Sequence, residues 1–151
     1  QLLREIGPGP YDEIFSRGFG DWRNYAVHSI QPALRLLGGR VTRVIDTGQG
    51  DHHLITVEND AGNRAFIEIR KCENQYEATP WQIGILKGGH YHVVTIKKFD
   101  EFYENMLTQA VTFFETKESP VSLEEMLDEV VVEVSADSSF ASRGQWIDVR
   151  L

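Results

Sequence analysis

One asparagine and one histidine stand four residues apart in a segment of helical character, a spacing that could support acid–base chemistry. On a helix, Asn24 and His28 would share one face, one turn apart. A histidine presented in this way is a candidate acid or base, because imidazole gains and loses a proton near neutral pH. The alternative is a partly buried histidine satisfied by a backbone carbonyl, with Asn24 as a helix-surface or capping residue.

The residues around His28 predict a ligand site beside an amphipathic helix. Trp22, Arg23 and Tyr25 suit stacking and hydrogen bonding to a sugar or polyol, although ordinary packing would also explain each of them. Apolar residues then recur at helical spacing, at Ile30, Ala33, Leu34 and Leu37. Pro32 leaves two possibilities: one helix runs through both His28 and Pro32, or a new helix begins at Pro32. In both, His28 lies beside backbone polar groups that can bind a ligand.

Residues 21–39 resemble a motif of the glucose-fructose oxidoreductase and inositol dehydrogenase family, Gfo/Idh/MocA. That motif is Asp-x-Gly-x-His, followed by an amphipathic helix and a glycine; here Asn24 replaces the aspartate and Ala26 the glycine, while His28 is kept. The resemblance implies that His28 hydrogen-bonds the reacting hydroxyl of a substrate and helps to move its proton while hydride passes to a nicotinamide. Asparagine can only hydrogen-bond the imidazole, which implies a less basic histidine, a changed substrate or lost activity.

The resemblance also implies a domain organisation. In the family this segment opens the second domain, so residues 1–151 would form a single C-terminal domain for substrate binding and dimerisation, without the N-terminal Rossmann domain. Neither Gly-x-Gly-x-x-Gly nor the Glu-Lys-Pro motif of the family's catalytic lysine occurs here, and the first residue is Gln1 rather than methionine. NAD or NADP is therefore expected on the full-length protein. This fragment alone is expected to bind no cofactor and to be inactive.

Composition disfavours several functional classes. The chain of 151 residues is 41% hydrophobic and 25% charged, enough for one globular core, and its net charge of −8 disfavours nucleic acid as a partner. No apolar run is long enough for a membrane span. Cys72 is the single cysteine, which is typical of a reducing compartment, and we expect a cytoplasmic protein. His90 and His92 would share one face of a strand, but two ligands without a suitably spaced third predict no metal site.

Alternating and periodic apolar residues predict an α+β fold. Strands are expected at 11–19, 41–47, 54–58, 65–70, 81–86, 91–96 and 146–151. One apolar helical stripe begins at Phe99, and another follows a capping box made by Ser122 and Glu125. Residues 130–134 are valine-rich and could form a strand on local propensity, but the capping box and the spacing favour helix. The predicted architecture is an open, mostly antiparallel sheet of about six strands, with the helices from Asp21, Phe99 and Ser122 on one face. The family resemblance implies this dihydrodipicolinate-reductase-like domain as well.

A sheet with helices on one face leaves its other face bare. Apolar residues occupy both parities of the strands, and the family pairs through this face, so a homodimer or higher homo-oligomer is expected. We expect the self-interface around Ile55, Val57, Phe66, Ile67 and residues 81–85, with His28 outside it. The leading interpretation is the substrate-binding and oligomerisation domain of an NAD(P)-dependent oxidoreductase that acts on a sugar or cyclic polyol. The rivals are a non-catalytic ligand-binding or assembly module that kept the fold, and an unrelated small α+β binding protein.

Overall fold

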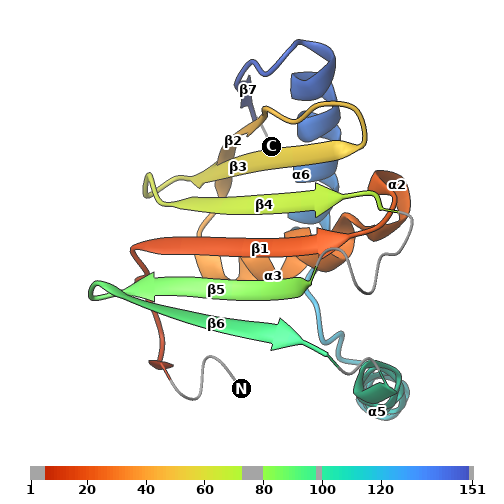
Figure 1. Cartoon of the computed structure of the whole chain (residues 1–151). Helices are drawn as coiled ribbons and strands as arrows, with labels where there is room; N and C mark the ends of the chain where they lie inside the picture. The colour runs from red at the N-terminus through yellow and green to blue at the C-terminus, as the bar shows by residue number, and fades with distance from the viewer. Residues whose placement is uncertain (1–5, 73–79, 98–99, 150–151) are drawn as a thin grey trace.

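A computed structural model describes residues 6–72, 80–97 and 100–149 of the chain. They include a seven-stranded sheet with the order β6-β5-β1-β4-β3-β2-β7 (Figure 1). The strands are β1 (Glu13–Phe19), β2 (Val41–Asp46), β3 (His52–Asn59), β4 (Arg64–Arg70), β5 (Trp81–Lys87), β6 (His90–Ile96) and β7 (Ile147–Asp148). The helices are α2 (Trp22–Tyr25), α3 (Val27–Leu37), α5 (Asp100–Thr116) and α6 (Leu123–Ala141). Neighbouring strands are antiparallel except for β1 and β4, so the predicted open, mostly antiparallel α+β sheet is confirmed.

The parallel pair follows from the connection through α3. After β1 the chain crosses the sheet through α3 to β2, then returns through the antiparallel strands β3 and β4, which fill the gap between β2 and β1. A crossover of this kind needs a helix, because a tight turn cannot join parallel strands. The hairpins, by contrast, turn tightly at Gly62 and at Gly88-Gly89, whose positive φ angles glycine adopts without strain.

One face of the sheet is covered and forms the core. α3 packs on β1 and β4, and α6 packs on β2 (Figure 1). Burial of one large aliphatic side chain beneath these helices is worth about 1.5–3 kcal/mol. Ile55, Val57 and Ile67 are all buried on this side, so their expected place in a self-interface was wrong. The reason is the two-residue period of a strand, in which a shift of one residue exchanges the two faces.

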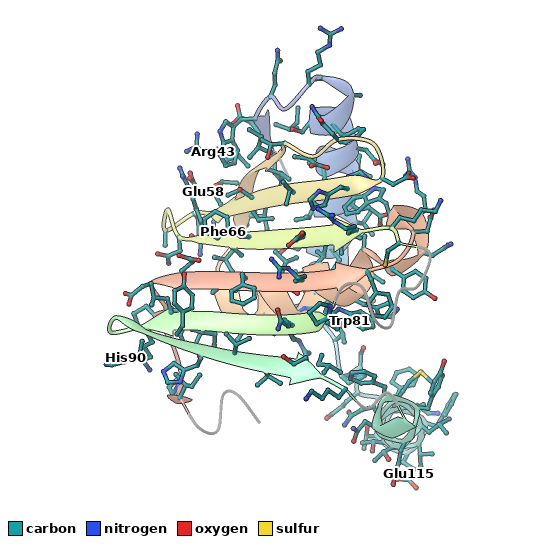
Figure 2. All side chains as sticks on the ribbon, viewed as in Figure 1. Arg43, Glu58, Phe66, Trp81, His90 and Glu115 are labelled. Atoms are coloured by element: carbon teal, nitrogen blue, oxygen red, sulfur yellow. The ribbon has the colours of Figure 1, made fainter. Side chains whose placement is uncertain are left out.

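The opposite face of the sheet is open and mixed in character (Figure 2). Four of its apolar side chains are exposed: Leu54, Phe66, Tyr91 and Val93. Two clusters of ion pairs lie among them. In one, Glu68 contacts Arg17 and His52, and in the other Glu58 contacts Arg43 and Arg64. Each cluster contains both signs of charge, so neither gives the open face a large net charge.

The position of α5 differs from the prediction. Phe99 lies outside the described residues, and α5 begins at Asp100. This helix projects from the β6 edge of the sheet instead of covering its face (Figure 1), and each of its described side chains except Ala110 is exposed. The prediction that three helices stack on one face is therefore wrong for α5. An apolar stripe shows that a helix needs a partner but not which partner it takes.

The C-terminal elements follow the sequence closely. The Ser122 hydroxyl accepts a hydrogen bond from the Glu125 amide at 3.1 Å, and the Glu125 carboxylate accepts one from the Ser122 amide at 2.9 Å, which confirms the capping box. Residues 130–134 lie inside α6, so the helical interpretation is confirmed, whereas β7 is shorter than the predicted last strand. None of the helices in the described part of the chain is long and apolar enough to cross a membrane.

Candidate functional site

The segment with Asn24 and His28 lies at one edge of the sheet, where β1 and β4 end and β5 begins (Figure 1). Asp21 caps α2, and its carboxylate accepts a hydrogen bond from the Arg23 amide at 3.1 Å. α2 ends at Tyr25 and α3 begins at Val27, with Ala26 between them. His28 and Pro32 both lie within α3, so one helix runs through both residues and no new helix begins at Pro32.

Aromatic rings surround the exposed imidazole of His28. The Trp81 ring meets it edge-on, with centroids 5.4 Å apart and planes at 80°, and the Tyr25 ring lies 6.0 Å away. Trp81 is itself held in place, because its Nε1 donates to the Ser29 hydroxyl at 3.2 Å and its ring lies 5.3 Å from that of Phe19. Figure 2 shows Trp81 at the start of β5. We call Phe19, Tyr25, His28 and Trp81 the aromatic edge.

Two glycines of the β1 end allow this close packing. Gly18 lies under Ser29 and Trp81, where a Cβ would come within 2.8 Å of the indole nitrogen. Gly20 has a φ of +117° and lies against the Tyr25 ring, so a side chain there would be both strained and obstructed. The positions of these aromatic rings therefore depend on the bare backbone at the end of β1.

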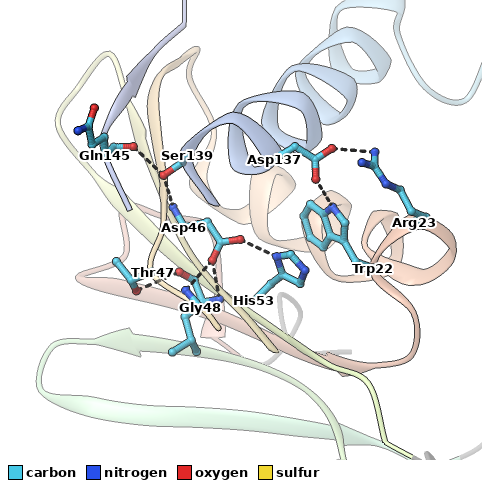
Figure 3. Close-up of polar contacts among 10 residues, drawn as sticks. Trp22, Arg23, Asp46, Thr47, Gly48, His53, Asp137, Ser139 and Gln145 are labelled. Carbon is cyan, nitrogen blue, oxygen red and sulfur yellow. Dashed lines mark hydrogen bonds and ion pairs between the residues drawn. The ribbon is translucent and has the colours of Figure 1, made fainter. Parts of the chain in front are cut away.

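A largely buried polar network holds the start of α2 against the core (Figure 3). The Trp22 indole stacks on the His53 ring, with centroids 4.4 Å apart, and its Nε1 donates to Asp137 of α6 at 2.8 Å. The same carboxylate pairs with Arg23 at 2.7 Å. On the other side, Nδ1 of His53 and the buried Asp46 carboxylate share a hydrogen bond of 2.6 Å. This network fixes α2, and with it the part of the aromatic edge that α2 supplies.

The structure separates the predicted site residues. His28 and Tyr25 meet in the aromatic edge, with His28 exposed and Tyr25 half-buried. Trp22 is only 8% exposed and belongs to the core, whereas Arg23 is exposed but paired with a carboxylate of α6. Asn24 is exposed, and within the described ranges no hydrogen bond joins it to His28. The described contacts of the imidazole ring are therefore with aromatic rings rather than with the residue one turn earlier.

Sequence reasoning missed Trp81 as part of the site and the support from Asp46 and Asp137. Trp81 is distant from His28 in the sequence, and only the pairing of β1 with β5 brings them together. His52 and His53 point to opposite faces of β3: His52 contacts Glu68 on the open face, and the buried His53 joins the network. Across residues 6–72, 80–97 and 100–149, no three His, Cys, Asp or Glu side chains group so as to hold a metal ion.

The geometry of the aromatic edge suits a small polar ligand with apolar faces. An exposed imidazole can accept a proton from a bound hydroxyl or donate one to it. Indole and phenol rings present flat apolar surfaces together with one polar group each. A sugar or polyol ring, with C–H faces and hydroxyl rims, matches both properties.

Sequence comparison finds no match, whereas structural comparison finds proteins that share the fold. No protein-family model matches the chain, and no curated protein matches it. The WlbA dehydrogenase from Bordetella pertussis, solved with NADH and UDP-GlcNAcA, superposes with a TM-score of 0.72 at 17% identity over 99% of this chain. Scyllo-inositol dehydrogenase from Lactobacillus casei, solved with NAD(H) and scyllo-inositol, gives 0.73 at 12% identity over 98% of the chain. A myo-inositol dehydrogenase from Corynebacterium glutamicum ATCC 13032 gives 0.72 at 11% identity over 99%.

These matches cover nearly all of this chain but only part of each enzyme. The chain spans 58% of the length of the Bordetella enzyme and 59% of each of the other two. At such low identity the likeness shows a shared fold. The chain therefore has the α+β fold that forms part of these inositol and sugar dehydrogenases, and the fold implied by the sequence resemblance is confirmed.

Proposed function

We propose that this chain is the substrate-binding domain of an NAD(P)-dependent oxidoreductase of the Gfo/Idh/MocA family that acts on a sugar or cyclic polyol. The observation that carries the proposal is the exposed His28 imidazole, held edge-on by Trp81 in a fold shared with inositol dehydrogenases. In this proposal Tyr25 and Trp81 contact the substrate ring. Arg23 and Asn24, both exposed, border the site, and Trp22 supports it from the core.

His28 is the catalytic residue in this proposal, and it acts on the proton of one substrate hydroxyl. When a hydroxyl-bearing carbon is oxidised to a carbonyl, the hydroxyl proton must leave, and a neutral imidazole accepts it and returns it in the reverse direction. The sequence lacks Gly-x-Gly-x-x-Gly, the turn that holds the pyrophosphate of a dinucleotide in a Rossmann domain. In this proposal NAD or NADP, which would take the hydride, is therefore bound mainly by the rest of the full-length protein, and the chain alone is expected to be inactive.

Ligand binding by the chain itself can be tested with scyllo-inositol as the probe. Saturation-transfer NMR should detect contact with the unmodified chain and a much weaker signal for His28→Gln and Trp81→Leu. Phe66→Ser, which removes an exposed ring from the open face, is the matched control and should leave the signal unchanged. Equal signals from all four chains, each folded by circular dichroism, would refute the site.

Catalysis is tested in the full-length protein. There, His28→Gln should lower kcat for NAD- or NADP-dependent polyol oxidation by about 10²–10⁴-fold, the usual contribution of a general acid or base. Binding of scyllo-inositol should weaken far less than kcat, since the aromatic rings remain. A kcat that is unchanged in His28→Gln would exclude the imidazole from proton transfer.

A second candidate function is a non-catalytic ligand-binding module, and Asn24 is the observation that favours it. An amide cannot stabilise an imidazolium as a carboxylate does, and no hydrogen bond joins Asn24 to His28 within the described ranges. Asn24→Asp distinguishes the two functions in the full-length protein. Turnover that is present and rises in this variant supports the enzyme, whereas inositol binding without turnover in either chain supports the module.

We also propose that the open face of the sheet pairs with a second copy of the chain. Its exposed apolar side chains form the kind of surface that soluble proteins cover, and its mixed charges do not repel a copy of themselves. A two-fold axis would bring the same face of both copies together. Sedimentation velocity should find a dimer that Phe66→Glu converts to monomers. A monomeric unmodified chain would overturn this assembly.

A further inference from the structure

The helices α5 and α6 carry a second exposed apolar surface. Tyr103, Leu107 and Phe114 recur along one side of α5, and Leu127, Val130 and Val134 recur along α6. All six are exposed at spacings of three, four or seven residues, which places each set on one side of its helix. On α6 the buried residues, Val132, Ser135, Ala136 and Ser139, occupy the other side. Each helix thus presents an exposed apolar stripe.

Two adjoining grooves lie beside these helices. One, of about 680 Å³, runs between α3 and α5, where Met106 and Phe113 of α5 face Gln31 and Arg35 of α3. The other, of about 460 Å³, runs between α3 and α6 and shares Gln31 and Arg35 with the first. We call the two grooves together the helix trough. Its apolar wall on α5 and its length along α3 suit an amphipathic helix.

The helix trough and the open face of the sheet differ in charge: the helices beside the trough are acidic, whereas the open face carries charges of both signs. α5 contains four carboxylates and α6 contains six, whereas neither helix contains a lysine or arginine. The whole chain carries −8, so the remainder of the chain is slightly positive. Asp128 and Glu129 border the trough, and burial raises the pKa of both carboxyls despite the nearby Arg40 and Arg35. The trough therefore combines an apolar wall on α5 with the three carboxylates Glu125, Asp128 and Glu129, which outnumber its one lining arginine, Arg35.

We propose that the helix trough binds a basic amphipathic helix of a partner protein. The apolar side of that helix would contact Met106 and Phe113, and its lysines and arginines would face the α6 carboxylates that line the trough, Glu125, Asp128 and Glu129. A second copy of this chain is a poor occupant, because its own exposed helices are acidic and like charges would meet. Anionic lipid surfaces are disfavoured for the same reason. The open face and the helix trough thus select different partners.

The probe is a fluorescein-labelled helical peptide of 18 residues with leucine on one side and lysine on the other, followed by fluorescence anisotropy against the 151-residue chain. It should bind about tenfold more tightly than a peptide of the same composition with its apolar side scrambled. Met106→Ser with Phe113→Ser, and separately Asp128→Asn with Glu129→Gln, should each weaken binding by about fivefold or more. Phe66→Ser on the open face should change it by less than about twofold.

Three results would overturn the proposal. The scrambled peptide could bind as tightly as the amphipathic one, which would show attraction to net charge alone. The Phe66→Ser chain could lose as much affinity as the trough variants, which would place binding elsewhere. Sedimentation could find a dimer of the unmodified chain that Met106→Ser with Phe113→Ser abolishes, which would assign the trough to a second copy. Circular dichroism of each variant establishes that it is folded.

Discussion

Replacement of Asp46 by alanine tests how strongly the buried network under α2 stabilises the chain. The Asp46 side chain is completely buried, and its carboxylate accepts hydrogen bonds from the Gly48 amide at 2.9 Å and the Leu54 amide at 3.0 Å. It shares a third, of 2.6 Å, with Nδ1 of His53. Alanine removes both carboxylate oxygens. Asparagine keeps one oxygen for the two amides and puts its NH₂ group opposite Nδ1 of His53.

The expected size of the effect follows from these contacts. A buried hydrogen-bonding group that loses its partner costs about 1–3 kcal/mol. Asp46→Ala leaves the Gly48 amide, the Leu54 amide and the His53 ring nitrogen without theirs, so we expect a loss of about 3–5 kcal/mol. This would be a large part of the free energy of unfolding of such a domain, which is about 5–15 kcal/mol. Asp46→Asn should cost about 1–2 kcal/mol, because it keeps an acceptor for both backbone amides and weakens one contact.

Urea unfolding followed by tryptophan fluorescence measures both variants. Trp22 stacks on His53, so loss of Asp46 should also shift the emission of the folded chain, because it releases the ring against which the indole lies. Asp51→Ala at an exposed position is the matched control and should change the free energy of unfolding by less than about 0.5 kcal/mol. A loss below about 1 kcal/mol for Asp46→Ala, with an unchanged m-value, would refute the reasoning.

Three further perturbations test other parts of the chain. Gly18→Ala should force the Trp81 indole away from β1, cost about 1–3 kcal/mol in urea unfolding and weaken the scyllo-inositol signal in NMR. A signal of full strength would show that the aromatic edge tolerates the methyl group. Ser122→Ala should remove the N-cap of α6 and cost about 1 kcal/mol; an unchanged urea midpoint would contradict this. Hydrogen bonds from Arg43, which has the larger effect, and from Arg64 hold the pKa of Glu58 below its ordinary value of 4.5. The stabilisation that results is present at neutral pH and lost in acid, so Glu58→Gln should flatten the fall of stability below pH 4.5, as followed by urea unfolding.

The features that the sequence predicted correctly are those encoded within a few residues. The alternation in β3 and β4 and the capping box of α6 each depend on neighbours in the chain. The faces of the strands were harder, because β4 has apolar residues of both parities, Phe66 outward and Ile67 inward. Only the packing of α3 over β4 decides which of them is buried.

The features that the sequence did not reveal depend on contacts between distant segments. Asp137 belongs to the last helix, and nothing near it in the sequence indicates that its carboxylate will meet Trp22 and Arg23. The same holds for Trp81, whose strand reaches the aromatic edge through its pairing with β1. α5 illustrates the opposite case: its apolar stripe was correctly recognised, but its exposure depends on which surfaces the rest of the chain already covers.

A carboxylate beside an imidazole can both orient the ring and stabilise its charged form, and around His28 these two roles do not fall to one residue. Here the edge-on contact with Trp81 restricts the orientation of the ring, while Asn24 contributes no negative charge. In the proposed site the aromatic edge orients the ligand and the imidazole transfers the proton. Asn24→Asp adds a negative charge at position 24 and leaves the aromatic edge intact. In the full-length protein this substitution therefore tests proton transfer separately from binding.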